Sequence, residues 1–401
     1  MDREGTSGLA AMLGFSTRHI SRELVAAVGA PPLVLARAQR VRTAVSLIER
    51  TDLAFAQIAF AAGFSSIRQF NETVVAVTRR SPTEIRGDRP AVRAEGGPIR
   101  LNLELPAREP FDGAAVVAFF AARAVAGVEW GGPGSGGLGS FSRVLDLPGG
   151  PATAVMTPTT ASLQIDLTLS DPADLIAAVS RCRRLFDLDA DTATIDEALM
   201  ADPILAPWIA ARPGLRVPGA ADGFEMLVRA IVGQQVSVAV AVVTLGRIVE
   251  LIGSGRFPRA DELAAIDPEL LAMSRSRAVT LVTAANAVAD GQLDLGVGAD
   301  RDLAVRALRG VRGIGPWTAS IVALRWYRDP DVLPAGDAGI HRGLAAVGVT
   351  GPDVVRSSFE RWSPWRSHAA VHLWANDPKA PDANAPVPSV IDAGNTTEES
   401  T

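Results

Sequence analysis

The chain has 401 residues, of which 48% are hydrophobic and 21% are charged. This length exceeds one ordinary domain and the apolar content can fill real cores, so two or three domains are expected and global disorder is excluded. The single cysteine, Cys182, excludes a disulfide scaffold, an iron–sulfur cluster held by four thiolates and a cysteine-rich zinc module. Lys379 is the only lysine among 39 basic residues, so a buried catalytic lysine has no candidate in the folded part.

The net charge of −5 by itself argues against nucleic acid binding, but the charge is unevenly distributed. Residues 1–95 carry +4, residues 96–218 carry −5, residues 219–376 are neutral and residues 377–401 carry −4. We expect residues 377–401, which lack apolar periodicity, to be a disordered acidic tail. A signal peptide and an apolar run of about 18 residues are both missing, so we expect a cytoplasmic protein without a membrane partner.

Residues 1–90 are expected to be helical, with a pattern that occurs twice. An apolar helix leads to Gly14-Phe15-Ser16, and another leads to Gly63-Phe64-Ser65; a polar helix follows each, and residues 33–49 form a continuous amphipathic helix between them. Glycine permits the turn, phenylalanine fills the core, and Ser16 and Ser65 cap the helices that would enter the major groove.

This arrangement resembles the AraC-type DNA-binding domain, in which one long helix joins two helix-turn-helix units. The alternative is a helical bundle with solvated arginines. AraC-type domains have a further helix before the first unit, and only Met1 to Thr6 precede it here, so we expect either a truncated start or a poorly supported first unit. The resemblance implies DNA contacts by Thr17, Arg18, Ser21, Arg22, Ser66, Arg68, Gln69 and Asn71.

A small α+β domain is expected over residues 98–175. Alternating apolar residues predict strands over 100–105, 141–147, 153–157 and 163–169, and a helix over 111–126. Residues 176–376 are helical almost throughout. The sequence therefore predicts a mainly α, multidomain protein with domains at 1–90, 98–175 and 176–376.

The most informative stretch runs from Leu308 to Leu324. A helix ends at Leu308, a hairpin with Gly313 and Gly315 follows, and a second helix starts near Trp317. Glycines let the backbone approach a phosphate, and the N–H groups at the following helix start point at it. Such a helix-hairpin-helix holds a DNA backbone without reading the bases, with Gly313, Gly315 and Thr318 as the contacts.

About twenty residues after Trp317, Asp337 lies in a Gly-rich segment before an apolar helix. Taken alone, such an Asp is most simply a helix N-cap. The hairpin followed by Asp337 resembles the helix-hairpin-helix base-excision glycosylase superfamily, in which a catalytic Asp occurs at this spacing. The resemblance therefore implies a catalytic role for Asp337.

Segments at 119–125, 181–191, 223–237 and 362–374 are similar to one subfamily, DNA-3-methyladenine glycosylase II, including its half-TBP-like N-terminal α+β domain. The resemblance implies a base pocket formed by Trp317, Trp374 and Phe119, and insertion of Gln235 into the duplex. An indole face attracts a cationic N-alkylated purine, although each tryptophan alone could be a core residue.

Two pocket positions that are bulky in the family are Ala338 and Gly339 here, which leaves the pocket's size and substrate range open. The implied mechanism uses a carboxylate near C1′ to stabilise oxocarbenium charge. Bifunctional relatives use a hairpin lysine to cut the strand. This hairpin has no lysine, so we predict a monofunctional glycosylase that leaves an abasic site. The resemblance implies a monovalent cation at the carbonyls of Arg309, Val311 and Gly313, and no other cofactor is expected.

The combination resembles bacterial adaptive-response regulators without their zinc domain, whose cysteine accepts a methyl group. Cys182 lies elsewhere and is expected to be in a core. One hypothesis is a monomeric, nucleoid-associated repair enzyme that acts on duplex DNA with alkylated bases. The alternative is an AraC-family regulator that binds promoter DNA and uses the glycosylase fold to detect damage. Asp337 together with Trp317 and Trp374 favours the enzyme.

Overall fold

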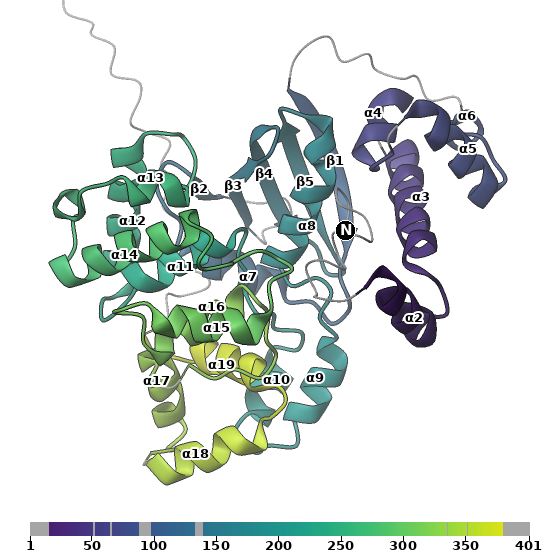
Figure 1. Ribbon diagram of the computed structural model, residues 1–401. Coiled ribbons are helices and arrows are strands. Elements are labelled where there is room, and N and C mark those ends of the chain that lie inside the picture. The colour runs from purple at the N-terminus through teal and green to yellow at the C-terminus, as the bar shows by residue number, and fades with distance from the viewer. Residues whose placement is uncertain are drawn as a thin grey trace, which may run out of the picture. The chain divides into compact units, whose positions relative to one another are not determined.

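The computed structural model describes residues 16–50, 53–64, 66–87, 98–132, 139–334, 336–350 and 352–379 (Figure 1). The chain divides into two compact units. The first comprises Met1–Leu103, Leu147–Ala152 and Leu167–Val179. The second comprises Glu104–Asp146, Thr153–Asp166 and Ser180–Thr401, and it contains the residues discussed below as a candidate active site.

The first unit begins with a group of short helices around one long helix. These are α2 (Thr17–Val28), α3 (Pro32–Arg50), α4 (Phe55–Ala61), α5 (Ile67–Thr78) and α6 (Pro82–Arg86). The long helix α3 confirms the continuous helix expected over residues 33–49. The predicted helix before Ser16, with its turn at Gly14, lies outside the described residues.

Serine caps start the two polar helices of this group. The Ser16 hydroxyl accepts the His19 N–H at 3.1 Å, as predicted for α2. In α5 the cap is Ser66, which accepts the Gln69 N–H at 3.2 Å. The sequence analysis placed this cap one residue earlier, at Ser65, which lies outside the described residues.

Aromatic packing holds the second helix pair together. Gly63 adopts a φ of 80°, which a turn between α4 and α5 requires and which glycine adopts without strain. The turn places Phe64 in the core, where it is 4% exposed and meets Phe70 edge-on at 5.6 Å between ring centroids. The predicted roles of Gly63 and Phe64 are thereby confirmed.

A five-stranded sheet follows, in the order β1-β5-β4-β3-β2. Its strands are β1 (Ile99–Pro106), β2 (Glu129–Gly132), β3 (Ser140–Leu147), β4 (Gly150–Pro158) and β5 (Ser162–Leu169). The four expected strands are confirmed, because alternate residues of each face a core. Strand β2 was not predicted: its short sequence, Glu-Trp-Gly-Gly, has no apolar alternation, and its pairing with β3 defines it.

Helix α7 (Gly113–Ala121) is shorter than the helix expected over 111–126. Asp112 caps it by accepting the Ala115 N–H at 3.0 Å, so the helix cannot include Phe111.

A buried network of four charges joins this part of the chain to the helices that follow. Glu129 of β2 and Arg143 of β3 bind each other at 3.1 Å, and Arg143 binds Glu225 at 2.6 Å. Arg229 binds both glutamates.

The rest of the described chain is helical, with two 3-10 turns. The helices are α8 (Leu175–Leu185), α9 (Thr192–Leu199), α10 (Ala206–Ala211), α11 (Gly223–Val232), α12 (Val238–Ile252), α13 (Ala260–Ala264), α14 (Arg275–Ala289), α15 (Arg301–Gly310), α16 (Pro316–Arg325), α17 (Ala338–Ala346), α18 (Pro352–Arg361) and α19 (Arg366–Ala375). The turns are η2 (Pro172–Asp174) and η3 (Pro268–Leu270). The protein is therefore mainly α with one small sheet, as predicted.

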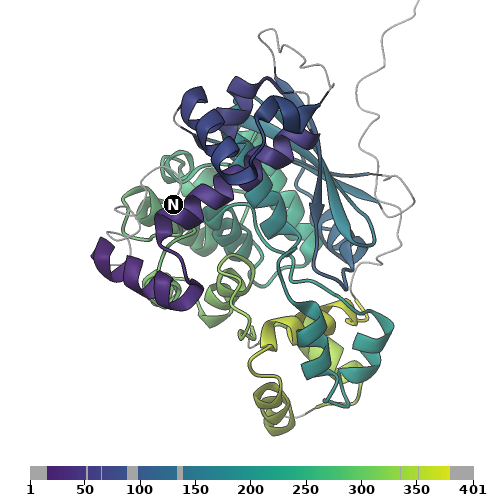
Figure 2. The ribbon, with the colours of Figure 1, turned by 90° about the vertical axis from the view of Figure 1, so that its right-hand side faces the viewer.

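Two apolar cores meet within the second unit. One is built around α11, α14 and α16, with Leu227, Leu281 and Val322 fully buried. The other joins α9 and α10 to α17–α19, which lie side by side in both views although they are far apart in sequence (Figures 1 and 2). Trp374 contacts both cores and is only partly buried, so it marks where they meet.

Candidate active site

Asp337 is the N-cap of α17, and its side chain binds two helices besides its own. Oδ1 accepts the N–H groups of Gly339 at 2.9 Å and Ile340 at 3.1 Å, as an N-cap does. The same oxygen accepts the indole N–H of Trp374 at 2.9 Å, and Oδ2 accepts that of Trp317 at 2.9 Å. The Asp337 side chain is therefore an N-cap and at the same time the acceptor that joins two tryptophans.

The two tryptophans reach Asp337 from different helices. Trp317 is in the first turn of α16, directly after the hairpin, and Trp374 is near the end of α19. Both are partly buried against the core of α11, α14 and α16. Because both indoles end on one carboxylate, the structure brings together three residues that the sequence assigned to the site.

The hairpin is tied to the loop after α11 through Gln234. Its amide nitrogen donates to the Gly313 carbonyl at 3.0 Å and to the Thr318 hydroxyl at 2.9 Å. Thr318 is 2% exposed, so its hydroxyl is used inside the protein. The sequence analysis did not single out Gln234, although the adjacent Gln235 marked this loop as part of the site.

Gln235 has a left-handed backbone, with φ of 56°, and its side chain is exposed. For a residue other than glycine this conformation costs about 1 kcal/mol or more, and such strain gathers at functional sites. Arg277 holds the loop by donating to the carbonyls of Val232 and Gln234. The loop thus presents Gln235 outward while its neighbour is held by the hairpin.

Phe119, the third expected pocket aromatic, is covered by two guanidinium groups. Arg123 lies 3.8 Å and Arg325 lies 4.9 Å from its ring centroid. Burial lowers the pKa of Arg123 to about 10, and the charge of Asp337 opposes the shift. The charges of Arg123 and Asp337 therefore interact, and Arg123, four residues after Phe119, is a residue that the sequence did not single out.

Gly339 lies close to both Trp374 and Asp337. A methyl group at this position would be 3.0 Å from Cδ1 of Trp374 and 3.2 Å from Oδ1 of Asp337. Ala338 is exposed. Because residues 338 and 339 carry no large side chain, Trp374 and Asp337 line the start of α17 in their place.

The expected cation carbonyls are partly engaged already. The Val311 carbonyl accepts the Ile314 N–H at 3.0 Å, and the Gly313 carbonyl accepts the Gln234 amide. Each carbonyl has a second lone pair, so these hydrogen bonds do not prevent the carbonyls from accepting a monovalent cation. Within the described ranges, His, Cys, Asp and Glu side chains form no group of three that could hold a metal ion.

Comparisons with known proteins agree with this arrangement. Family models match in three places: a helix-turn-helix domain over residues 9–88, an AlkA N-terminal domain over 102–222, and an HhH-GPD superfamily base excision DNA repair protein over 228–366. The chain is 42% identical over 388 residues to a Mycobacterium tuberculosis protein named probable bifunctional transcriptional activator/DNA repair enzyme AlkA. That match covers 93% of this chain and 77% of the relative.

DNA-3-methyladenine glycosylase 2 of Escherichia coli is 35% identical over 286 residues, which are 68% of this chain and 96% of that protein. The chain belongs to the HhH-GPD superfamily of base excision DNA repair proteins. It is a DNA glycosylase, a hydrolase of N-glycosyl bonds, joined to an AraC-type helix-turn-helix domain. The fold is also that of a 3-methyladenine DNA-glycosylase from Archaeoglobus fulgidus, with a TM-score of 0.58 at 20% identity, over 69% of this chain and 97% of that one.

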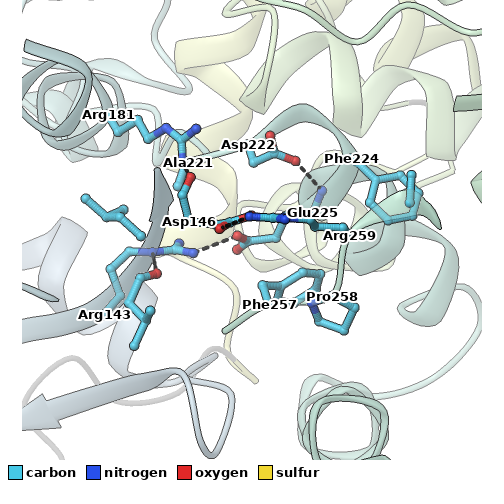
Figure 3. A pocket seen from close by; sticks show the side chains of 13 residues that line it. Arg143, Asp146, Arg181, Ala221, Asp222, Phe224, Glu225, Phe257, Pro258 and Arg259 are labelled. Atoms are coloured by element: carbon cyan, nitrogen blue, oxygen red, sulfur yellow. Dashed lines mark hydrogen bonds and ion pairs between the residues drawn. The ribbon is translucent and has the colours of Figure 1, made fainter. Parts of the chain in front are cut away.

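A separate cavity of this HhH-GPD protein is lined by β3 and the start of α11 (Figure 3). Four of its charged side chains pair with one another: Arg143 binds Glu225, and Arg259 binds Asp146. None of the expected site residues lines it.

Cys182 is fully buried, as expected, and burial raises the pKa of its thiol to about 12, which leaves it unreactive.

The residues expected to contact DNA in the N-terminal unit lie on exposed surface. This holds for Thr17, Arg18, Arg22, Ser66, Arg68, Gln69 and Asn71, whereas Ser21 is half-buried. Ser66 is also engaged as the cap of α5, and Arg68 forms an exposed ion pair with Glu72 at 2.8 Å. Among the residues that the structure describes, no helix is long and apolar enough to cross a bilayer.

The two hairpin glycines should respond differently to substitution. Gly313 has a φ of 91°, and a methyl group there would lie 2.0 Å from the Thr280 hydroxyl of α14. Gly315 has a φ of −88° and no atom within 4 Å of that position. We expect Gly313→Ala to lower the free energy of unfolding by about 2 kcal/mol or more and to weaken duplex binding, while Gly315→Ala changes stability little. Chemical denaturation would measure the stability of each variant, and fluorescence anisotropy would measure its duplex binding. Equal loss of stability in the two variants would contradict the special role of Gly313 in the hairpin turn.

Proposed function

We propose that the chain excises N-alkylated purines of the 3-methyladenine type from duplex DNA and leaves an abasic site. The observation that carries the proposal is the Asp337 carboxylate, which accepts both pocket indole N–H groups. Two relatives named for 3-methyladenine or for AlkA support the substrate class. We assign the regulatory, α+β and glycosylase domains to residues 1–90, 98–175 and 176–376.

Asp337 is suited to stabilise positive charge on the sugar. Its four hydrogen-bond partners are all donors, so they match the carboxylate form. Breaking the N-glycosidic bond builds oxocarbenium charge on the deoxyribose, and a fixed carboxylate lowers the energy of that transition state without having to reorient. The same carboxylate can orient or deprotonate the attacking water.

The flipped base would lie against Trp317 and Trp374. Binding of their N–H groups to Asp337 fixes both ring planes, and an indole face attracts a cationic purine more strongly than a neutral one. The Arg123 guanidinium over Phe119 adds a positive charge near Asp337. The charge of Arg123 would repel a cationic base, whereas the indole faces would attract it. We propose that the balance of these two effects sets the substrate range.

The hairpin would bind the DNA backbone beside the flipped nucleotide. The N–H groups at the start of α16 and the loop at Gly313 and Gly315 face a phosphate in this role. A monovalent cation held by the carbonyls of Arg309, Val311 and Gly313 would supply positive charge to the same phosphate. Gln235, exposed and strained, would fill the space that the base leaves in the duplex.

Replacement of Asp337 by Asn should abolish base release. Asn keeps the shape but loses the charge that stabilises the oxocarbenium ion, and its amide nitrogen cannot accept one of the two indole N–H groups. We expect single-turnover release of 3-methyladenine from alkylated duplex to fall at least about 10³-fold. Binding to a duplex with an abasic-site analogue should change less than about fivefold. The released base would be measured by chromatography, and turnover at the wild-type rate would remove Asp337 from its role.

Strand cleavage should not accompany base release. Lys379 is the only lysine of the chain, and it follows α19, outside the hairpin. An amine is required for Schiff-base chemistry, so we expect intact abasic strands on denaturing gels and no protein–DNA adduct after borohydride. A trapped adduct in wild-type protein would overturn the monofunctional assignment. Lys379→Ala is the matched control, because it should leave both results unchanged.

We also propose regulatory binding of promoter DNA through the N-terminal domain. The exposed polar surfaces of α2 and α5, each after a serine cap, and the activator named among the relatives favour it. Arg18→Ala and Gln69→Ala should reduce protection of promoter DNA in footprinting about tenfold each. Base release should stay unchanged. Arg37→Ala, an exposed arginine of α3, is the control. Equal loss in all three variants would show that the loss does not depend on the proposed contacts of α2 and α5.

A further inference from the structure

Asp377, just after α19, forms a close ion pair with Arg342 of α17. The Arg342 Nε lies 2.8 Å from Oδ1 of Asp377, and Nη2 lies 2.6 Å from Oδ2. The Asp377 side chain is only 8% exposed. This two-point geometry is the strong form of an arginine–carboxylate contact. The sequence analysis assigned Asp377 to the acidic tail.

The pair lies directly beside the candidate active site. A methyl group on Gly339 would be 3.3 Å from Oδ2 of Asp377, 3.2 Å from Oδ1 of Asp337 and 3.0 Å from Cδ1 of Trp374. Side chains from two distant places in the chain, the start of α17 and the end of α19, therefore meet around one point. The hydrogen bond to Asp377 raises the pKa of Arg342, burial opposes this, and the charges of Asp377 and Asp337 add to the rise.

Trp374 needs such support because of its place in α19. It is the last residue but one of the helix, and the cap residue Asn376 hydrogen-bonds only back into the same helix. Terminal turns of helices open most readily. Trp374 packs against both cores but is only partly buried, and residue 339 carries no side chain, so contacts beyond the helix end add to that packing at the terminal turn.

We propose that Arg342 and Asp377 are positioning residues that fasten the end of α19 to α17 and thereby keep the Trp374 indole on Asp337. The inference rests on the proposed base-release function for its kinetic effect. Its structural part does not. Without the pair, the last turn of α19 opens, the indole leaves the carboxylate, and both the base platform and one hydrogen bond to Asp337 are lost.

The other end of α19 supplies a matched control. There Arg366 binds Asp331 in the same two-point manner, at 2.6 and 2.8 Å. We expect Asp377→Asn and Arg342→Gln to slow single-turnover base release about tenfold or more, while Asp331→Asn and Arg366→Gln change it less than about twofold. The double variant Arg342→Gln with Asp377→Asn should be no slower than either single variant, because all three break the same contact.

A readout without catalysis separates this inference from the proposed function. The seven tryptophans give indole N–H signals in ¹H–¹⁵N NMR spectra, and Trp374→Phe identifies the one of interest. Solvent exchange of that indole proton should accelerate about tenfold or more in Asp377→Asn and stay unchanged in Asp331→Asn. Unchanged exchange in Asp377→Asn would overturn the positioning role, even if the rate fell. A wild-type protein that releases no base would overturn the proposed function. The exchange result would still decide whether Arg342 and Asp377 position Trp374.

Discussion

One carboxylate is the point on which the site depends. Asp337 starts α17 as its N-cap and accepts the indole N–H groups of Trp317 from α16 and Trp374 from α19. A partly buried carboxylate is costly unless donors surround it, and here four do. The same hydrogen bonds that make the charge tolerable also set the planes of both rings, so the cap, the charge and the base platform are parts of one arrangement.

The position of this carboxylate follows from how the second unit is built. One core gathers α11, α14 and α16, and the other joins α9 and α10 to α17–α19. Trp374 contacts both cores, and α16 contributes Val322 to one and Leu324 to the other. A site at such a junction is supported from both sides by dense packing.

Charge is distributed to match these tasks. Glu129, Arg143, Glu225 and Arg229 neutralise one another in the interior, and the two arginines hold the pKa of Glu225 far below its usual range even though burial alone would raise it. Near the site the balance is left uneven. Arg123 lies over Phe119 without a carboxylate partner at bonding distance in the described structure.

Periodicity, helix capping and the hairpin motif are local properties, so the sequence by itself determined the helical class, four of the five strands, the long helix α3 and the hairpin before Trp317. The resemblance of its motifs to the glycosylase superfamily also selected Asp337, Trp317 and Trp374, with Asp337 expected to be catalytic and not only a cap. Only the tertiary structure decided that Asp337 joins both tryptophans, that Gln234 holds the hairpin, that guanidinium groups cover Phe119, and that Asp377 pairs with Arg342 next to Gly339. These contacts join residues far apart in the chain, and the packing of two cores against each other sets their distances, which no local pattern encodes.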